Sequence, residues 1–267
     1  MGGAERNARK RKQQSTAVSK AAAASGGKNW TTIAAVVAVI VLAVAVIGGI
    51  VWTNSGSGKT AGEAIPAVDD PGKLAYPGTR ENVTVVQGSE DAKATIDIYE
   101  DFLCPICGRF EKQYGDKIDQ KVQAGKLRVR YHMVPLLVEA SNPPGYSLDA
   151  ANAALCAADA GKFERYHDSL FAAQPAEGSS GYSNSQLIQL GRKIGIQGDT
   201  FAQCVKSNKY EKELKAALDQ ILNNPDLKQT IQGKKSFGTP TVVADGKILN
   251  VFQNPNWLSN LLSGSNK

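Results

Sequence analysis

Two cysteines separated by two residues, Cys104-Pro105-Ile106-Cys107, lie where a predicted strand passes into a predicted helix. Before them, residues 95–99 alternate apolar and polar side chains, which is typical of a half-buried strand. After them, apolar side chains recur every four residues, at Phe110, Tyr114, Ile118 and Val122. This period predicts an amphipathic helix that ends near residue 125, and alternation over residues 127–134 predicts a second strand. The chain therefore has to fold around a strand–helix–strand unit with both cysteines at its first turn.

A cysteine at a helix N-terminus meets unpaired backbone N–H groups and the positive end of the helix dipole, and both favour the thiolate. We expect Cys104 to occupy the exposed N-cap position and to be the attacking thiol. Cys107 follows one turn later and is expected to be the shielded, resolving thiol. Pro105 suits the first helical turn, where its missing N–H would have no partner. The pair is predicted to switch between dithiol and disulfide.

Two other interpretations of the cysteine pair are a zinc knuckle and a passive disulfide in a non-catalytic binding domain. Zinc sites built on such a pair usually need a second close pair. The remaining cysteines, Cys156 and Cys204, are far apart, and neither His132 nor His167 stands at ligand spacing from a cysteine. The sequence therefore favours a redox pair, and we predict no metal site and no cofactor.

The rest of the globular part predicts an α/β fold with a helical insertion over about residues 145–222. This insertion lacks a convincing strand, and its breaks predict helices at about 147–160, 162–173, 184–194, 199–206 and 208–222. A further helix is expected at about 225–235 and a last one near 255–262. Between them, Asp245-Gly246 joins two short apolar runs, which predicts a tight hairpin of residues 240–251.

Gly238-Thr239-Pro240 precedes a strand that should pair centrally, where a proline removes a ladder donor. A cis Thr239–Pro240 bond would explain this proline, and it would present the backbone groups of Thr239 to an extended peptide. We therefore predict that Thr239 and Pro240 form the binding site for a client strand.

Three features together resemble the DsbA-like branch of the thioredoxin superfamily, over roughly residues 83–262. They are the segment Glu100-Asp101-Phe102-Leu103-Cys104-Pro105-Ile106-Cys107, the long helical insertion, and Phe237-Gly238-Thr239-Pro240-Thr241 before the hairpin. The resemblance implies a thioredoxin-like fold with an inserted helical domain, with Pro240 as the family's cis-proline beside the cysteines. It also implies thiol–disulfide exchange on reduced secreted or cell-envelope client proteins, with a quinone-linked membrane oxidase as recycling partner.

One departure from the family pattern concerns the direction of exchange. Strongly oxidising members carry a histidine between the cysteines, whereas this chain has Pro105-Ile106, and Ile106 can neither carry charge nor donate a hydrogen bond. Asp101 adds a negative charge three residues before Cys104 and would oppose its thiolate. We expect an oxidase, while an isomerase and a reductase stay open.

The other cysteines and histidines receive structural roles. Cys156 and Cys204 are predicted to form one structural disulfide, the alternative being two buried free thiols. His132 is expected to pack in its strand, and His167 to lie on the surface of a helix. Asp97 is either a buried acid that serves Cys107 or, as we favour, a paired or solvent-facing carboxylate.

An uncharged apolar run from Ile33 to Val51 predicts a membrane anchor over residues 30–52. At helical rise the run spans roughly 28 Å, close to the hydrocarbon thickness of a bilayer. Trp30 and Trp52 flank it, and the basic residues before it should stay cytoplasmic. We expect a single-pass protein of the cell membrane with an extracytoplasmic catalytic domain. A cleaved signal peptide is the alternative.

The excess of basic residues lies outside the globular part. Seven of the 31 lysines and arginines but one of the 25 acidic residues lie in the tail, residues 1–29, so the rest of the chain is neutral. This distribution argues against a nucleic-acid-binding domain. Residues 53–82, rich in Gly, Ser, Pro and Ala, are expected to be a flexible linker to a domain of residues 83–267.

Overall fold

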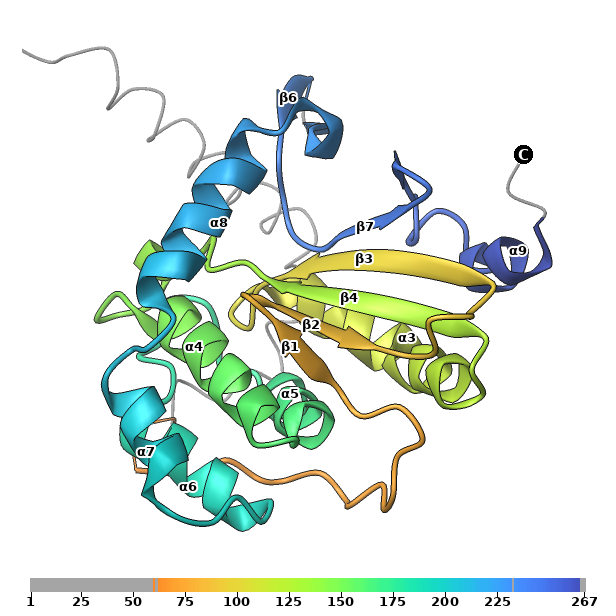
Figure 1. Ribbon diagram of the computed structural model, residues 1–267. Coiled ribbons are helices and arrows are strands. Elements are labelled where there is room, and N and C mark those ends of the chain that lie inside the picture. Colours follow the sequence, from red (N-terminus) through yellow and green to blue (C-terminus); the bar gives the residue numbers. More distant parts are fainter. Residues whose placement is uncertain (1–59, 61, 232, 265–267) are drawn as a thin grey trace, which may run out of the picture. The chain divides into compact units, whose positions relative to one another are not determined.

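A six-stranded mixed sheet with the order β1-β2-β4-β3-β7-β8 organises the domain (Figure 1). The structure is a computed structural model, and it describes residues 60, 62–231 and 233–264. The strands of this sheet are β1 (Thr79–Glu81), β2 (Thr84–Gln87), β3 (Ala94–Glu100), β4 (Leu127–Met133), β7 (Thr241–Ala244) and β8 (Lys247–Ile248). Strands β3 and β4 are parallel, whereas the other neighbours pair antiparallel.

The predicted strand–helix–strand unit is confirmed, with α3 (Pro105–Gln123) between β3 and β4. The buried face of α3 is the predicted one, and it consists of Cys107, Phe110, Tyr114, Ile118 and Val122. The Tyr114 ring packs edge-on to Trp257 of α9 (Trp257–Ser263), with ring centroids 5.6 Å apart. The buried face of α3 thus packs against the last helix midway along its length.

The helical insertion is also confirmed, with boundaries close to those predicted. The short helix η1 (Val138–Ala140) precedes it, and it contains α4 (Tyr146–Asp159), α5 (Phe163–Ala172), α6 (Asn184–Lys193), α7 (Asp199–Lys206) and α8 (Glu211–Asn223). Helix α4 is almost wholly buried, which its many alanines allow because neighbouring helices can approach them closely. In Figure 1 these helices gather beside the end of the sheet where β3 leads into α3.

Residues 225–235 differ from the helix that we predicted. Only the turn η2 (Pro225–Leu227) is helical, and a two-stranded hairpin of β5 (Gln229–Ile231) and β6 (Lys234–Ser236) follows. Gly233, with φ of 78°, supplies the left-handed conformation at its turn. The hairpin predicted at Asp245-Gly246 is confirmed, since both residues have positive φ, 50° and 72°.

The described part of the segment expected to be a flexible linker packs against the domain. Ile65 is 1% exposed, and the Gln123 side chain accepts a hydrogen bond from the Ala75 N–H at 2.8 Å. Strand β1 also belongs to this segment. The predicted anchor, residues 30–52, lies outside the described residues, and no helix within 62–231 or 233–264 is long and apolar enough to cross a membrane.

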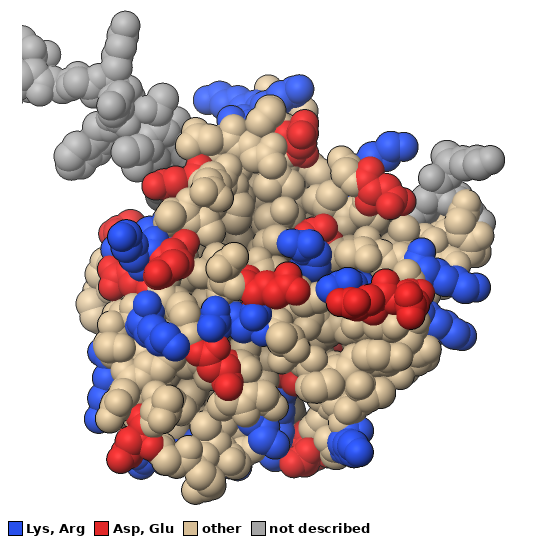
Figure 2. Space-filling model, viewed as in Figure 1, with Lys and Arg blue, Asp and Glu red and all other residues tan. Residues whose placement is uncertain are grey.

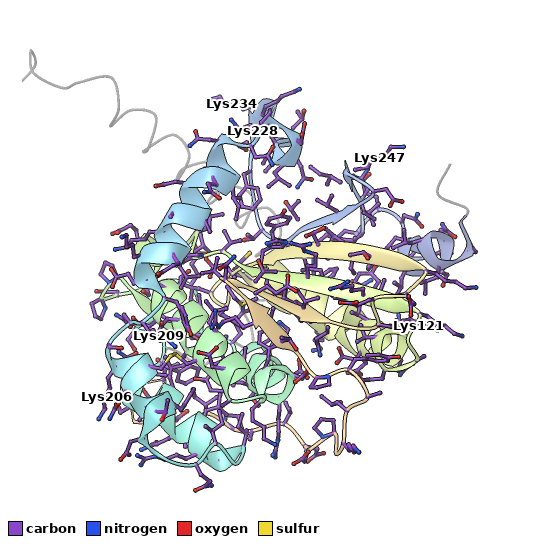
Figure 3. All side chains as sticks on the ribbon, viewed as in Figure 1. Lys121, Lys206, Lys209, Lys228, Lys234 and Lys247 are labelled. Carbon is purple, nitrogen blue, oxygen red and sulfur yellow. A yellow bond between two sulfur atoms is a disulfide. The ribbon has the colours of Figure 1, made fainter. Side chains whose placement is uncertain are left out.

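Basic and acidic side chains are interspersed over the face of the domain seen in Figure 2. Lys228 directly precedes β5 and Lys234 begins β6, so both lie at the β5–β6 hairpin, near the C-terminal end of α8 (Figure 3).

Candidate redox site

The two cysteines lie at the start of α3, directly after the central strand β3. Cys104 is the N-cap, with an extended backbone, and its carbonyl accepts the hydrogen bond of the Gly108 N–H at 3.1 Å. Cys104 was expected to be exposed, but only 6% of its surface is accessible, against 0% for Cys107. The order of accessibility is as predicted, while the site is more enclosed, because the segment around Thr239 covers it.

Thr239 and Pro240 lie beside the cysteines, and the peptide bond between them is cis, as predicted. The Cys104 thiol donates to the carbonyl oxygen of Thr239, with 3.2 Å between sulfur and oxygen. Pro240 precedes the first paired residue of β7, Thr241, which pairs with Tyr99 of β3. A proline there removes no ladder hydrogen bond. Cys104 thus meets Thr239 directly, Pro240 follows Thr239 through the cis bond, and Cys107 joins them from the first turn of α3.

The two thiols have opposite pKa shifts. A hydrogen bond from the Cys107 thiol lowers the pKa of Cys104 and outweighs burial, and the Thr239 side chain adds to the lowering. Burial raises the pKa of Cys107 well above its usual value, and its hydrogen bond to Cys104 raises it further. Cys104 is therefore the thiol of the pair that ionises first as the pH rises.

Asp101 is a buried acid that the sequence indicated only as a neighbouring charge. It is 2% exposed, and its carboxylate accepts hydrogen bonds from Leu103 N–H, Leu137 N–H and the Ser147 hydroxyl, at 2.8, 2.8 and 2.6 Å. Burial raises its pKa from 3.8 to about 6 in spite of these donors. Its charge also opposes the Cys104 thiolate, as we expected.

Gln174, which the sequence did not single out, ties the insertion to the active-site loop. Its side-chain amide donates to the carbonyl oxygens of Phe102 and Cys104, at 3.0 and 2.9 Å. Gly108 makes room for it, since a Cβ at Gly108 would lie 2.2 Å from Gln174 Oε1. Gln174 follows α5 by two residues, so only the tertiary fold could show this contact.

His167 was predicted to lie on the surface, and this is wrong: it is 3% exposed. Its Nε2 lies 2.7 Å from Glu100 Oε1, and its Nδ1 lies 2.9 Å from Asp168 Oδ1. Burial works against a charged imidazole, but the carboxylates of Glu100, Asp168 and Glu111 together outweigh it and raise the pKa of His167 well above its usual value. The apolar stripe of α5 could have revealed this position, because His167 stands four residues after Phe163 and four before Phe171.

Asp97 is not an acid that serves Cys107. Its carboxylate lies 2.6 Å from His132 Nε2 and 3.3 Å from Arg130 Nε, which agrees with the paired carboxylate that we favoured. His132 packs in β4, as expected, with its ring stacked on Tyr99 at a centroid distance of 4.2 Å.

The predicted disulfide between Cys156 and Cys204 is present and joins α4 to α7 (Figure 3). Both cysteines are buried, so the bridge lies inside the helical insertion. Next to it, Lys209 donates its backbone N–H to the Cys204 carbonyl at 3.2 Å, and its Nζ pairs with Asp159 at 3.1 Å.

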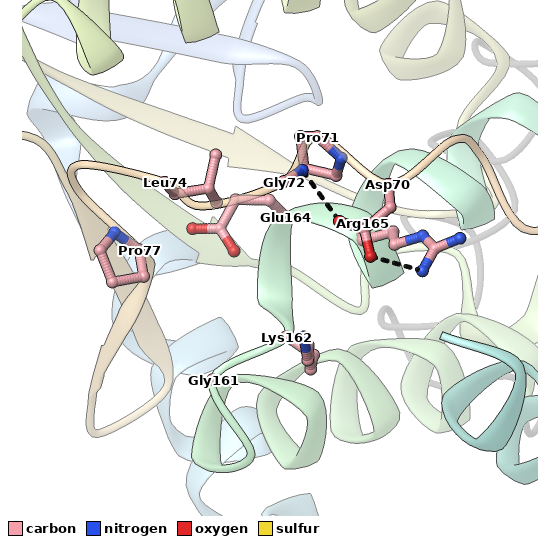
Figure 4. Close-up of a pocket in the computed structure, with 9 residues that line it drawn as sticks. All are labelled: Asp70, Pro71, Gly72, Leu74, Pro77, Gly161, Lys162, Glu164 and Arg165. Carbon is pink, nitrogen blue, oxygen red and sulfur yellow. Dashed lines mark hydrogen bonds and ion pairs between the residues drawn. The ribbon is translucent and has the colours of Figure 1, made fainter. Parts of the chain in front are cut away.

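A cavity of about 110 Å³ lies away from the cysteines, between the segment at Pro71 and the start of α5 (Figure 4). Its lining includes an Arg165–Asp70 ion pair at 3.3 Å and the Glu164 carboxylate. Glu164 is already engaged, since it accepts hydrogen bonds from the Gly78 N–H and the Gln87 side chain. With Asp70, Arg165 and Glu164 engaged in these contacts, the cavity offers no chemistry that rivals the cysteine pair.

A dithiol pair at the start of the helix after the central strand, with a cis-proline against it, defines a thioredoxin-fold protein with a redox site. Residues 80–263 match the family model described as thioredoxin. The chain belongs to this family, in its DsbA-like branch of thiol–disulfide oxidoreductases.

Individual relatives support this placement. Oxidised Mtb DsbA is 33% identical with a TM-score of 0.52, and the match covers 66% of this chain and 85% of that one. Reduced DsbG of Mycobacterium tuberculosis is 31% identical with a TM-score of 0.51, covering 68% and 91%. Serine/threonine-protein kinase PknE of Mycobacterium tuberculosis (strain ATCC 25618 / H37Rv) is 33% identical over 187 residues, 68% of this chain and 32% of the kinase. The chain thus spans about a third of the length of this relative.

Proposed function

We propose that the chain is an extracytoplasmic, membrane-anchored oxidase that introduces disulfides into secreted or cell-envelope proteins. The observation that carries the proposal is the pair of opposite pKa shifts, lowered at Cys104 and raised at Cys107, next to the backbone of Thr239. A nucleophile and leaving group with a low pKa beside a protonated partner is the arrangement that thiol–disulfide exchange requires.

In the proposed reaction, a client thiolate attacks Cys104 Sγ of the oxidised pair, and the bond between Cys104 and Cys107 breaks. Cys107 leaves and takes up a proton, in keeping with its raised pKa. A second client thiolate then attacks the client sulfur of the mixed disulfide, and Cys104 leaves as a thiolate. The client loses two electrons and gains a disulfide, while the enzyme becomes a dithiol. A quinone-linked membrane oxidase would accept these electrons.

Thr239 and Pro240 are proposed to hold the client as an extended strand. The Thr239 carbonyl accepts the Cys104 thiol in the free protein, so ionisation or disulfide formation at Cys104 releases it. A client N–H can then take its place, which aligns the client's cysteine with Cys104.

Two observations support the location. The uncharged run from Ile33 to Val51 follows a basic tail, as in a single-pass anchor with its N-terminus in the cytoplasm. A buried disulfide between Cys156 and Cys204 fits an oxidising compartment. Labelling intact cells with a membrane-impermeant thiol reagent after mild reduction tests this, since a cytoplasmic domain would stay unlabelled until lysis.

Oxidative refolding of a reduced client protein tests the activity. We expect Cys104→Ala to abolish the acceleration, and Cys107→Ala, with oxidised glutathione supplied as the oxidant, to accumulate a mixed disulfide between Cys104 and the client. Ser259→Ala, an exposed change on α9, is the control and should match the native chain. If Cys104→Ala accelerated refolding as well as the native chain, the domain would be a binding module with an inert cysteine pair.

A further inference from the structure

Close to the cysteine pair, two buried side chains and a half-buried one, from three different elements, converge. They are Glu100 at the end of β3, Glu111 one turn beyond Cys107 on α3, and His167 on α5. One carboxylate oxygen from each glutamate and one imidazole nitrogen lie within 4.8 Å of one another. Glu100 is 1% exposed, so this group is not an ordinary surface cluster.

Two oxygens of the group have no hydrogen-bond partner. Glu100 Oε2 and Glu111 Oε1 are buried and unpartnered, although Glu100 Oε1 engages His167. A buried carboxylate oxygen without a donor loses the full energy of its hydration. Two unpartnered oxygens beside an imidazole nitrogen are what a bound cation would satisfy.

The charges around the group point the same way. The neighbouring carboxyls Asp119 and Asp168 act electrostatically on Glu111, and no lysine or arginine of the described residues lies within 4 Å of any of these four carboxyls. His167 is thus the single counter-charge in contact with the group, and a divalent cation would neutralise the excess.

We propose that Glu100, Glu111 and His167 form a binding site for a zinc ion, with water as the fourth ligand. Imidazole nitrogen with carboxylate oxygen suits Zn²⁺ better than Mg²⁺ or Ca²⁺, which prefer oxygen alone. Zn–N and Zn–O bonds of about 2.0–2.1 Å place tetrahedral ligands ~3.3 Å apart, so rotation of the glutamate side chains closes the site. Asp168, which is hydrogen-bonded to Nδ1 of His167, would orient the ring with Nε2 toward the metal.

Direct binding of Zn²⁺ tests the site, in the full chain with Cys104→Ser and Cys107→Ser so that no dithiol competes. Isothermal titration against a chelator should show one Zn²⁺ per chain. Glu111→Gln should weaken binding at least tenfold, and Asp168→Asn, which alters a positioning residue, 10- to 100-fold. Glu213→Gln, an exposed change of the same kind on α8, should leave the affinity unchanged.

Absence of Zn²⁺ binding, or equal affinity in Glu111→Gln, would overturn the site. If Glu111→Gln does not fold, X-ray absorption of the Zn²⁺-loaded serine variant decides: nitrogen and oxygen ligands including one imidazole support the site, and a shell without imidazole refutes it. Since these measurements use a chain without the redox cysteines, their outcome is independent of the proposed function.

Discussion

Replacing Asp101 with asparagine should change the pH dependence of stability by a predictable amount. The carboxyl has a pKa of 3.8 in the unfolded chain and about 6 in the fold, because burial outweighs its three donors. Folding therefore tightens proton binding, and the stabilisation from this proton is complete below pH 4 and lost as the pH rises through 6. A shift of about 2 units at 1.36 kcal/mol per unit corresponds to about 3 kcal/mol.

The substitution has two opposing consequences. An asparagine amide in this place turns a donor toward Leu137 N–H or the Ser147 hydroxyl, which costs about 1–3 kcal/mol at every pH. Asparagine does not ionise, however, so the variant escapes the penalty of about 3 kcal/mol that the native chain incurs above pH 6. We expect the variant to be the less stable protein at pH 4 and to recover most of the deficit by pH 8.

Urea unfolding of the reduced native chain and of Asp101→Asn, at intervals from pH 4 to pH 8, measures this difference. Taking the difference between the two proteins cancels other buried groups, such as Asp119, whose pKa burial raises to about 7. Asp116→Asn, an exposed change on α3, serves as control and should run parallel to the native chain. A difference between native and Asp101→Asn that stays constant across this range would refute the assignment of Asp101 as a buried titrating acid.

Three further predictions concern the surroundings of the cysteines. Gly108→Ala should displace Gln174 and lower the free energy of unfolding by about 1–3 kcal/mol, since two hydrogen bonds to backbone carbonyls are lost. Adding Gln174→Ala to this variant should then lower the free energy of unfolding little further. If the effects of the two substitutions were fully additive in urea unfolding, the result would count against the contact. Replacing both Cys156 and Cys204 with alanine removes a disulfide that closes a loop with a sequence separation of 48. Because the unfolded chain gains conformational entropy, the free energy of unfolding should fall by about 4 kcal/mol. The pH profile of Cys104 alkylation should not change. Ile106→His places a cation in the first turn of α3, so it should lower the pKa of Cys104 in that same alkylation profile, and an unchanged profile would show that the side chain points away from the sulfur.

Much of this fold follows from local patterns. The strand–helix–strand unit was predictable because β3 and α3 bury one face each, so their periods of two and 3.6 stand out. The cis-proline was predictable because Pro240 opens a strand that pairs centrally, with Thr241 opposite Tyr99. In both cases the constraint acts within a few residues of the motif.

The remaining features depend on contacts between distant segments. Asp101 accepts hydrogen bonds from Leu137 and Ser147, which follow β4 in the chain. Its local sequence therefore shows a charge but not its burial. The hairpin of β5 and β6 was predicted as a helix, because its short strands carry mixed polar residues without a clear period. His167 is the exception, since its position in the apolar stripe of α5 indicated that it is buried.

The contacts at Cys104 bear on the direction of exchange. The hydrogen bond from the Cys107 thiol exists only in the dithiol state, so it stabilises the reduced enzyme and makes the disulfide the stronger oxidant. Asp101 acts in the opposite sense while it is ionised, and protonation near pH 6 removes that opposition. Each 30 mV of reduction potential corresponds to about 1.4 kcal/mol, so a single charge at this position can shift the potential by tens of millivolts. With Ile106 contributing neither charge nor hydrogen bond, the opposing effects of Cys107 and Thr239 on one side and Asp101 on the other bear on the reduction potential of this site.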